Sequence, residues 1–360
     1  MEFSIKTETF QEMVGKVVKC ATNNKLIPIT SLLSIKVEDN TLYLTTTDAV
    51  TYFYVKSKLL LSANGTFEVS VLADTFSKLI QKTTSADITV KYDETNFKLQ
   101  VIGNGTYTIE LPLDENGKPI KFPITDTSAK VKCGTLNLNA VKSALTYNKV
   151  ALSDNVTYPA LTQYYCGDSI ISTNQVKVCA NNEKVFDTPK LISPTLMELL
   201  GVLTGETVEV FELDKKLIFE TDCEYIIHNV VVNIEDFPVD SINNLVNSEF
   251  EAKCTISKDV VLNILDRLSL FMSSYDNKGI DLTVTANGIV LQTIAGSGVE
   301  IVPFISTEKF IDYHCRINVE ILRGLLSTYE TDNVEFSYGN PVAIKLSAGK
   351  ITQIAALMEE

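Results

Sequence analysis

The sequence predicts an α+β protein that is composed of three similar domains. At 360 residues, the chain is too long for a single hydrophobic core. One order of strands and helices recurs three times, and the first two repeats each end near a Phe-Pro pair, Phe122–Pro123 and Phe237–Pro238. Because proline interrupts strand pairing and fixes the chain direction, these pairs mark domain ends. We therefore predict domains at 1–126, 127–247 and 248–360, each with two helices packed on antiparallel sheets.

Each repeat opens with a short strand that leads into a first helix. The three openings read FSIKTETFQEMVGKVVKCAT, CGTLNLNAVKSALTYNKVAL and CTISKDVVLNILDRLSLFM. Apolar residues at helical spacing, such as Phe10 and Val14, predict a helix after each strand. Small polar residues favour helix starts, so Thr7, Asn137 and Ser257 are the expected N-caps.

A hairpin, a second helix and closing strands follow in every repeat. Polar and apolar residues alternate in DNTLYLTTTDAVTYFYV, GDSIISTNQVKVCA and NGIVLQTIAGSGVEIVPF, which predicts hairpins with one buried face. The second helices are expected in LADTFSKLIQKT, SPTLMELLGVL and NVEILRGLLSTY. After each Phe-Pro pair we expect a new strand.

Composition restricts the class of protein. The net charge of −14 argues against a protein that is coated with nucleic acid, although it leaves room for a local basic face. The N-terminal MEFSIKTE has no basic segment followed by an apolar run, so no secretory signal is expected. Apolar stretches such as YIIHNVVVNI are about half the length needed to span a bilayer. We expect a cytoplasmic protein without membrane contacts.

Catalytic and metal-binding patterns are not expected. The seven cysteines have no CxxC spacing, which favours buried thiols, and neither His228 nor His314 has a partner at ligand spacing. Glu235 and Asp236, adjacent on a predicted strand, would point to opposite faces and make a poor acid–base pair. The glycine turns GNGTYT and GSGVEI lack the lysine and the helix of a phosphate loop. We expect neither an enzyme nor a cofactor.

Several segments carry a family resemblance through their order and spacing. NNKLIPITSLLSIKVEDNTLYLTTTDAV, SDNVTYPALTQ, EDFPVD, INVEIL and NPVAIKL follow one another over essentially the whole chain. In this order the sequence resembles the bacterial DNA sliding clamp, the beta subunit family of DNA polymerase III. Clamps of eukaryotes and archaea have two repeats per chain, so three repeats select the bacterial type.

The resemblance implies a fold and a function. Two chains would associate head to tail into a ring, with helices lining the hole and sheets forming the outer wall. The ring would encircle duplex DNA without sequence preference and act as a processivity factor for a replicative polymerase, with a clamp loader as a further partner. Two alternatives stay open: a non-enzymatic β-rich structural or oligomeric repeat protein, and a clamp-like decoy that does not close on DNA.

The resemblance also implies three sets of site residues. The first two are the cations that face DNA and the residues of the dimer interface. A sliding ring needs phosphate contacts, since base contacts would stall it. The expected DNA-facing cations lie on or near the helices: Lys16, Lys19, Lys25, Lys78, Lys82, Lys142, Lys149, Arg267 and Arg323. An apolar seam should close the dimer, with Tyr107 and Ile109 of one chain against Phe271 and Met272 of the other.

The third implied site is an apolar groove for short peptides of the polymerase and the loader. The chain departs from the family at this groove, where it reads TNQVKV, and at its end, AALMEE, where Glu359 and Glu360 replace a basic group. We therefore hypothesise an altered peptide preference, and a divergent, phage-encoded clamp is one interpretation. The implied groove residues are Leu161, Thr162, Thr173, Lys177, Val178, Pro238, Asn318, Ile321, Ile354, Ala355 and Met358.

Overall fold

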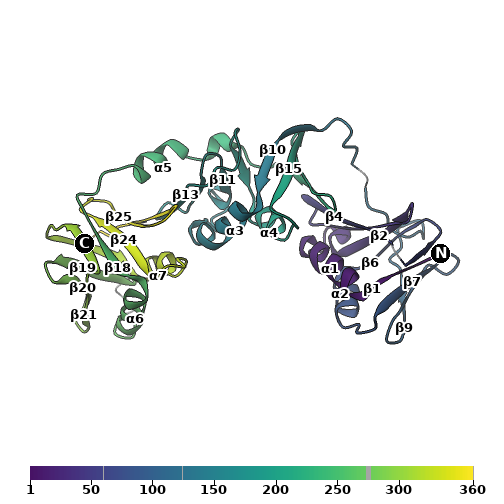
Figure 1. The fold of residues 1–360 in the computed structure, drawn as a ribbon, viewed down its shortest axis with the longest axis horizontal. Coiled ribbons are helices and arrows are strands. Elements are labelled where there is room, and N and C mark those ends of the chain that lie inside the picture. Colours follow the sequence, from purple (N-terminus) through teal and green to yellow (C-terminus); the bar gives the residue numbers. More distant parts are fainter. Residues whose placement is uncertain (60, 124, 273–276, 360) are drawn as a thin grey trace. The chain divides into compact units, whose positions relative to one another are not determined.

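A computed structural model describes residues 1–59, 61–123, 125–272 and 277–359 (Figure 1). The chain forms two compact units. The first contains Met1–Leu138 and Glu198–Val231, and the second contains Asn139–Met197 and Val232–Glu360. Each unit holds two antiparallel sheets, so the predicted α+β class is confirmed. No helix in the described ranges is both long and apolar enough to cross a membrane.

The first unit combines a five-stranded and an eight-stranded sheet. The five-stranded sheet has the order β5 (Ser62–Asn64), β1 (Glu2–Lys6), β7 (Asp87–Asp93), β8 (Lys98–Ile102) and β9 (Thr106–Glu110). The eight-stranded sheet has the order β10 (Val131–Asn137), β15 (Thr207–Leu213), β16 (Lys216–Glu220), β17 (Glu224–Asn229), β4 (Thr51–Lys58), β3 (Thr41–Thr47), β2 (Leu32–Glu38) and β6 (Phe67–Leu72).

Two helices, α1 (Thr7–Val17) and α2 (Ala73–Gln81), pack side by side in this unit (Figure 1). The buried ring of Phe10 on α1 lies 5.9 Å from both Phe3 on β1 and Phe76 on α2, measured between ring centroids. Edge-to-face aromatic contacts of this kind add to the burial of apolar area. They fix both helices on β1.

The second unit combines a nine-stranded and a four-stranded sheet. Its helices are α5 (Val239–Val246), α6 (Lys258–Ser269), α7 (Val319–Leu326) and most of α3 (Leu138–Tyr147), and α4 (Pro194–Leu200) crosses the limit between the units. The nine-stranded sheet runs β14 (Lys190–Ile192), β11 (Tyr164–Cys166), β12 (Ile170–Thr173), β13 (Lys177–Asn181), β26 (Ile351–Ala356), β25 (Ala343–Ala348), β24 (Asn333–Tyr338), β18 (Ala252–Ser257) and β22 (Ser306–Lys309). The four-stranded sheet runs β21 (Val299–Val302), β20 (Gly288–Thr293), β19 (Gly279–Thr285) and β23 (Tyr313–Asn318).

The strand order reveals the repeat that the sequence predicts. One run of four hydrogen-bonded neighbours occurs as β1-β7-β8-β9, as β10-β15-β16-β17 and as β18-β24-β25-β26. A second run occurs as β6-β2-β3-β4, as β14-β11-β12-β13 and as β23-β19-β20-β21. In each repeat one helix (α1, α3 or α6) follows the first strand, and another (α2, α4 or α7) precedes the second strand of the first run.

Successive repeats are joined by strand pairing. Strand β17 pairs with β4, with Ile226 opposite Phe53, and β26 pairs with β13, with Ile354 opposite Val178. The last strand of one repeat thus extends the hairpin sheet of the preceding repeat. The two large sheets therefore bridge the boundaries predicted near residues 126 and 247. Strand β9 of the first repeat and β21 of the third hold the corresponding places, and both lie at the end of their sheets.

A matching turn supports the equivalence of the first two repeats. The hydroxyl of Thr47 accepts a hydrogen bond from the backbone N–H of Ala49 at 3.0 Å, and that of Thr173 accepts one from Gln175 at 3.1 Å. Ala49 and Gln175 both have a left-handed backbone, with φ of 80° and 78°. The segments TDAV and TNQV therefore form the same turn.

Four local expectations from the sequence can be compared with the structure. Ser257 caps α6 as predicted, since its hydroxyl accepts a hydrogen bond from the N–H of Val260 at 3.2 Å. Thr7 is not a cap: it is the first residue of α1 and is buried, and Lys6 occupies the cap position. The strand predicted after Pro238 is wrong, because helix α5 follows it. Residues Ile234–Asp236 form a 3-10 helix, η5, in place of the predicted strand.

The cysteines are free and largely buried. Cys20, Cys166, Cys179, Cys254 and Cys315 are buried, Cys133 is half-buried and Cys223 is exposed. Within the described ranges, no group of three or more His, Cys, Asp or Glu side chains is placed to hold a metal ion.

Candidate functional site

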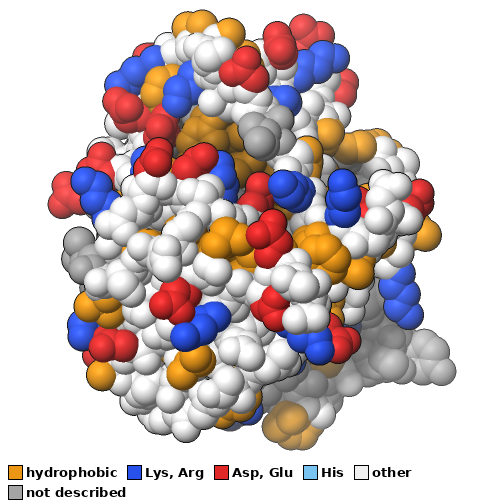
Figure 2. Space-filling model, turned by 90° about the vertical axis from the view of Figure 1, so that its right-hand side faces the viewer, with side chains coloured by type: hydrophobic (Ala, Val, Ile, Leu, Met, Phe, Trp, Pro, Cys, Tyr) orange, Lys and Arg blue, Asp and Glu red, His pale blue; other side chains and the backbone are white. Residues whose placement is uncertain are grey.

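Acidic and basic side chains are interspersed on the molecular surface, as the face drawn in Figure 2 shows. The distribution bears directly on the predicted DNA-facing cations. A cation that neighbouring carboxylates neutralise contributes less to phosphate binding than an unpaired one. Of the nine predicted residues, four have carboxylate partners, four have none within salt-bridge distance among the described residues, and Lys149 is exposed.

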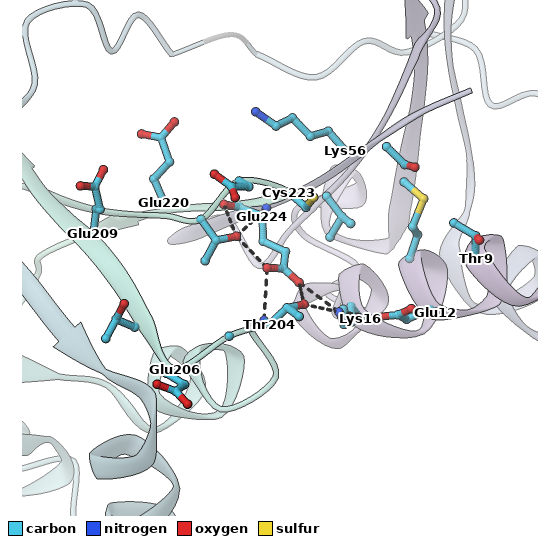
Figure 3. Close-up of a pocket in the computed structure, with 17 residues that line it drawn as sticks. Thr9, Glu12, Lys16, Lys56, Thr204, Glu206, Glu209, Glu220, Cys223 and Glu224 are labelled. Carbon is cyan, nitrogen blue, oxygen red and sulfur yellow. Dashed lines mark hydrogen bonds and ion pairs between the residues drawn. The ribbon is translucent and has the colours of Figure 1, made fainter. Parts of the chain in front are cut away.

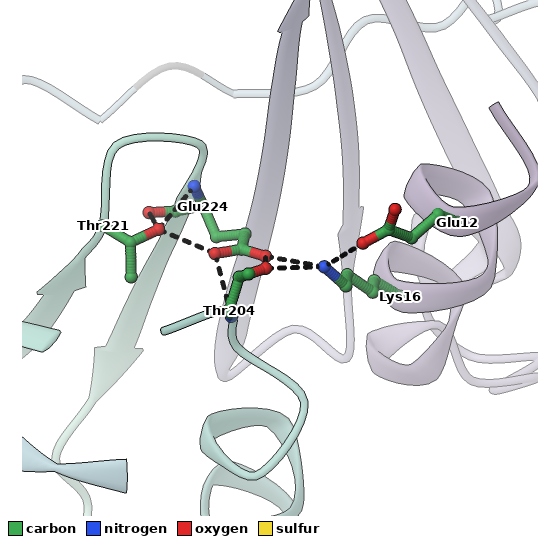
Figure 4. A network of polar contacts seen from close by, with 5 residues as sticks. All are labelled: Glu12, Lys16, Thr204, Thr221 and Glu224. Atoms are coloured by element: carbon green, nitrogen blue, oxygen red, sulfur yellow. Dashed lines mark hydrogen bonds and ion pairs between the residues drawn. The ribbon is translucent and has the colours of Figure 1, made fainter. Parts of the chain in front are cut away.

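Lys16 on α1 belongs to the first group. Its ammonium donates to Glu12 Oε1 at 2.7 Å, to Glu224 Oε1 at 3.0 Å and to Thr204 Oγ1 at 2.7 Å (Figure 4). The carboxylate of Glu224 also accepts hydrogen bonds from Thr204 and from Thr221. Because β17 pairs with β4 beneath α1, the fold brings Glu224 to Lys16 across 208 sequence positions.

The titration of both groups reflects this network. Burial alone would raise the pKa of Glu224, but hydrogen bonds from Thr204, Thr221 and Lys16 outweigh burial and leave the pKa below its ordinary value. Burial alone would lower the pKa of Lys16, but its bonds to Glu12 and Glu224 raise that pKa above the ordinary value. Both groups stay charged at neutral pH.

The network lies at one side of a polar pocket of about 810 Å³ in the first unit. Figure 3 shows the Glu224 carboxylate between Thr204 and Lys16, with the Glu206, Glu209 and Glu220 side chains on the surrounding strands and loop. Glu209 and Glu220 are paired with Lys132 and Lys130. The pocket is therefore an acidic, ion-paired surface and not a catalytic constellation.

Three further predicted cations are paired with neighbouring acids. Lys78 contacts Asp74 one turn earlier on α2 at 2.7 Å. Arg267 on α6 donates two hydrogen bonds to Glu300 on β21, at 2.8 and 2.5 Å. Arg323 on α7 contacts Asp266 Oδ1 on α6 at 2.6 Å. The pairs of Arg267 and Arg323 attach α6 to β21 and α7 to α6, whereas the Lys78 pair lies within α2.

The remaining predicted cations are exposed. Lys19 lies on the 3-10 turn η1 (Val18–Cys20), Lys25 in the loop after it, and Lys82 at the C-cap of α2. Lys142 lies on α3 and Lys149 on the 3-10 turn η3 (Lys149–Ala151) of the second unit. For the first four, no acid lies within salt-bridge distance in the part of the chain that the structure describes.

Seven predicted groove residues gather around the β13–β26 joint of the second unit. Leu161, Val178 and Ile354 share one buried hydrophobic cluster with Phe237 and Ile242, which come from the segment around α5. The joint extends through the following residues: Lys177 lies opposite Ala355, Thr173 lies opposite Val178, and Thr162 follows Leu161 on the 3-10 turn η4 (Pro159–Thr162). Burial lowers the pKa of Lys177.

The other four predicted groove residues lie on separate elements. Pro238 is exposed at the start of α5, and Ile321 packs on the core around α6 and α7. Asn318 caps α7 by accepting hydrogen bonds from the N–H groups of Glu320 and Ile321. Met358 bonds through its N–H to the carbonyl of Arg316 at 2.9 Å. Glu359 is exposed, and Glu360 lies outside the described residues.

The predicted dimer residues lie on or near the two edge strands β9 and β21. Tyr107, 45% exposed, and the half-buried Ile109 are on edge strand β9. Phe271, 57% exposed, follows α6, and its carbonyl accepts a hydrogen bond from Ser297 just before β21. Met272 packs partly on the core of the second unit.

Comparison with known proteins shows which fold the chain has. Residues 1–139 match the sequence model of the DNA polymerase III beta subunit, N-terminal domain. No curated protein sequence matches the chain. The solved beta subunit of Streptococcus pyogenes is similar to the chain with a TM-score of 0.86 at 18% identity, over 100% of both chains. The DNA polymerase III beta chain of Streptococcus pneumoniae gives 0.85 at 15% identity over 100% of both chains, and the Bacillus subtilis sliding clamp gives 0.82 at 15%, over 100% of this chain and 99% of that one.

This chain has the bacterial sliding-clamp fold. Its N-terminal part matches the DNA polymerase III beta subunit family, so the resemblance drawn from the sequence is confirmed. The sequence identities to these solved structures are 14–18%, so the fold is shared although the sequences have diverged.

Sequence reasoning did not single out several exposed apolar residues beside the predicted sites. Val299 and Ile301, 53% and 54% exposed on β21, form an apolar edge that the alternation of GVEIVPF contains but does not assign to a surface. Val176, 44% exposed in the turn before β13, is a further apolar residue beside the joint, since its carbonyl accepts the N–H of Ala356. The acids that neutralise four predicted cations are distant in sequence or on another element in most cases, so periodicity could not reveal them.

Proposed function

We propose that the protein is a DNA polymerase processivity factor that encircles duplex DNA as a homodimeric ring. The single observation that carries this proposal is the pair of edge strands β9 and β21, each of which lies at the end of its sheet. At the two joints within the chain, the strand equivalent to β9 pairs with the strand equivalent to β21 of the preceding repeat. The same rule applied between two copies pairs β9 of each chain with β21 of the other.

The residues on these edges suit a covered interface. Exposed strand edges with apolar side chains invite pairing with another chain. In such an interface, Tyr107 on β9 of one chain would lie against Val299, Ile301 and Phe271 of the other. Each of these side chains is about half exposed in the single chain. Two head-to-tail contacts of one kind close a two-chain assembly of six similar domains.

The pattern of exposed cations and of cations with carboxylate partners suits weak DNA contact. The exposed lysines Lys19, Lys25, Lys82, Lys142 and Lys149 are flexible point charges on or near helices. Phosphate contacts of this kind give affinity without reading sequence. We expect Lys16, Lys78, Arg267 and Arg323 to support the helices more than they bind DNA, because each is paired with a carboxylate.

We place partner binding at the β13–β26 joint. The apolar floor of Leu161, Val178 and Ile354 and the exposed Val176 would accept short apolar segments of a replicative polymerase or a clamp loader. Lys177, half-buried at the rim, adds a cation that favours an acidic residue in the segment. This is the altered peptide preference that the sequence suggests. The proposed role places the protein in the cytoplasm, where such partners act.

A topological experiment tests the proposal. The protein is concentrated with nicked circular DNA, so that dissociated chains can close around it, and the mixture is sized in salt that removes phosphate contacts. We expect the protein to stay with the circle and to be released after a single cut linearises the DNA. Equal loss from circular and linear DNA would show that the chain is a non-encircling decoy or a structural protein.

A further inference from the structure

A second pocket of about 790 Å³ lies in the second unit, at the end of the β13–β26 joint where Asn181 pairs with Ile351. It is formed by α3, the end of β13, the β25–β26 turn and the loop between α7 and β24 (elements in Figure 1). The residues that define its chemistry are Ser143, Tyr147, Asn181, Glu183, Asp332 and Lys350.

The base of this pocket contains a buried amide with a free acceptor. Asn181 is fully buried, and its Nδ2 donates to Ser143 Oγ at 2.8 Å, while its Oδ1 has no partner in the part of the chain that the structure describes. The fully buried Asn148 beside it donates to the carbonyls of Ile170 and Cys179, both at 3.0 Å, which leaves its Oδ1 unpaired as well.

A third buried amide belongs to the same face of the sheet. Gln353 lies opposite Cys179 across the β13–β26 joint and also has an unpaired acceptor, Oε1. An unpaired acceptor that is buried loses its bond to water without replacement, so such groups are rare in folded proteins. Of the three amides Asn181 lines the pocket, so a hydrogen-bond donor that enters the pocket would satisfy its Oδ1.

The walls of the pocket specify the charge of that donor. Asp332 is exposed and is oriented by Ser257 Oγ and by the N–H of Asp259, at 2.9 to 3.0 Å, and within the described residues it has no ion pair. The other charges of the wall, Glu183 and Lys350, neutralise each other at 2.8 Å. The start of α6 and the nearby Lys258 stabilise the Asp332 carboxylate, which stays exposed and without an ion pair among the described residues, so this wall favours a cation.

Aromatic rings in the pocket favour a flat cation. The half-buried Tyr147 lines the pocket beside Tyr329, with 6.2 Å between the ring centroids. A flat cation can stack on such a ring while its edge donates hydrogen bonds. Phosphate would meet Asp332 and the amide oxygens with the wrong charge, and an ammonium would present its donors without a stacking face.

We propose that this pocket binds a guanidinium group, stacked on Tyr147 and donating to Asp332 and to the Asn181 amide. The group can come from a small guanidinium compound or from an arginine side chain of a partner protein. Binding at this site requires neither ring formation nor DNA. The proposal can therefore be tested independently of the proposed function.

Saturation-transfer NMR on the full chain tests the proposal with three probes: acetyl-Gly-Arg-Gly-amide, acetyl-Gly-Lys-Gly-amide and agmatine. We expect the arginine peptide to bind at least about fivefold more tightly than the lysine peptide, since only guanidinium stacks and donates from one plane. Tighter binding of the arginine peptide than of agmatine points to a protein partner, and the reverse points to a small compound.

Matched variants locate the binding. D332N keeps an acceptor for the helix contact but removes the charge, and we expect about fivefold weaker binding of the arginine peptide. N181L removes the amide, with the same expectation, and its thermal unfolding shows whether it is folded. D168N, which makes the same charge change on the β11–β12 turn, should bind as the parent does. Equal binding of arginine and lysine peptides, no saturation transfer, or unchanged binding in D332N would overturn the proposal.

Discussion

Lys16 and Glu224 form the least exposed ion pair among the residues that the structure describes, with side-chain exposures of 19% and 1%. Removing one partner of a buried pair leaves a charge without its counterion. We predict that Lys16→Met lowers the free energy of unfolding by about 3 kcal/mol. Lys78→Met removes a cation from an exposed pair on α2 and should cost less than about 1 kcal/mol. Urea unfolding of both variants checks this, and equal losses would contradict the structural role of Lys16.

The same pair predicts a dependence of stability on pH. The pKa of Glu224 is lowered in the folded protein, so its contribution is complete above the ordinary value of 4.5 and is lost as the pH falls through the folded value. Glu224→Gln should therefore destabilise the protein at pH 7, and its deficit relative to the parent should shrink below about pH 4.5. Thermal unfolding of both proteins from pH 7 to pH 3 measures this. A deficit that stays constant would rule out the ionised Glu224 as its source.

Residue roles were the least predictable part of the molecule. The resemblance assigned Lys16 to DNA because it lies on the first helix, but its partner Glu224 is 208 positions away. No local pattern connects them, since strand pairing between repeats creates the contact. By contrast, the Ser257 cap follows from local chemistry alone and was predicted correctly.

The matching turns before β4 and β13 each contain a residue with a left-handed backbone. Gln175 has φ of 78°, a conformation that costs a side-chain-bearing residue more than glycine. We predict that Gln175→Gly raises the stability of the protein by up to about 1 kcal/mol, whereas Gln175→Val lowers it. Chemical unfolding of the two variants compares them. A loss of stability in the glycine variant would mean that the Gln175 side chain has contacts that outweigh the strain.

The free edge β21 makes a sharper prediction. Ile301 is 54% exposed in the single chain and would be covered by β9 of a second copy. Ile301→Glu should therefore convert the dimer to a monomer without loss of fold, because a buried unpaired charge is costly. Light scattering after gel filtration gives the mass, and circular dichroism checks the fold. Val342→Glu, at an exposed turn of the second unit, is the control that should stay dimeric.

Elements were predictable where their pattern is local. The helices after β1, β10 and β18 and the three hairpins follow from apolar periodicity, which the structure confirms. Helix α5 replaces the strand expected after Phe237–Pro238, and VDSINNLV has its apolar residues at helical spacing. The joints β17–β4 and β26–β13 pair residues that are far apart in sequence, so no window of sequence could show them.

At the scale of the whole molecule, one pairing rule accounts for the architecture. Each joint continues a sheet from one repeat into the next, and of the strands that hold the joint positions only β9 and β21 lie at the end of a described sheet. The three-repeat order could be read from the sequence because each repeat has its own helices and hairpins. The proposed ring depends on contacts between two copies of the chain. Only the family resemblance predicts these contacts from the sequence.

Electron microscopy of the purified protein, combined with its mass in solution, tests the ring most directly. The account predicts closed two-chain particles of twice 39.8 kDa with a central hole that admits duplex DNA. In those particles β9 of each chain should pair with β21 of the other. Monomers at micromolar concentration, or dimers joined through other surfaces without a hole, would contradict it.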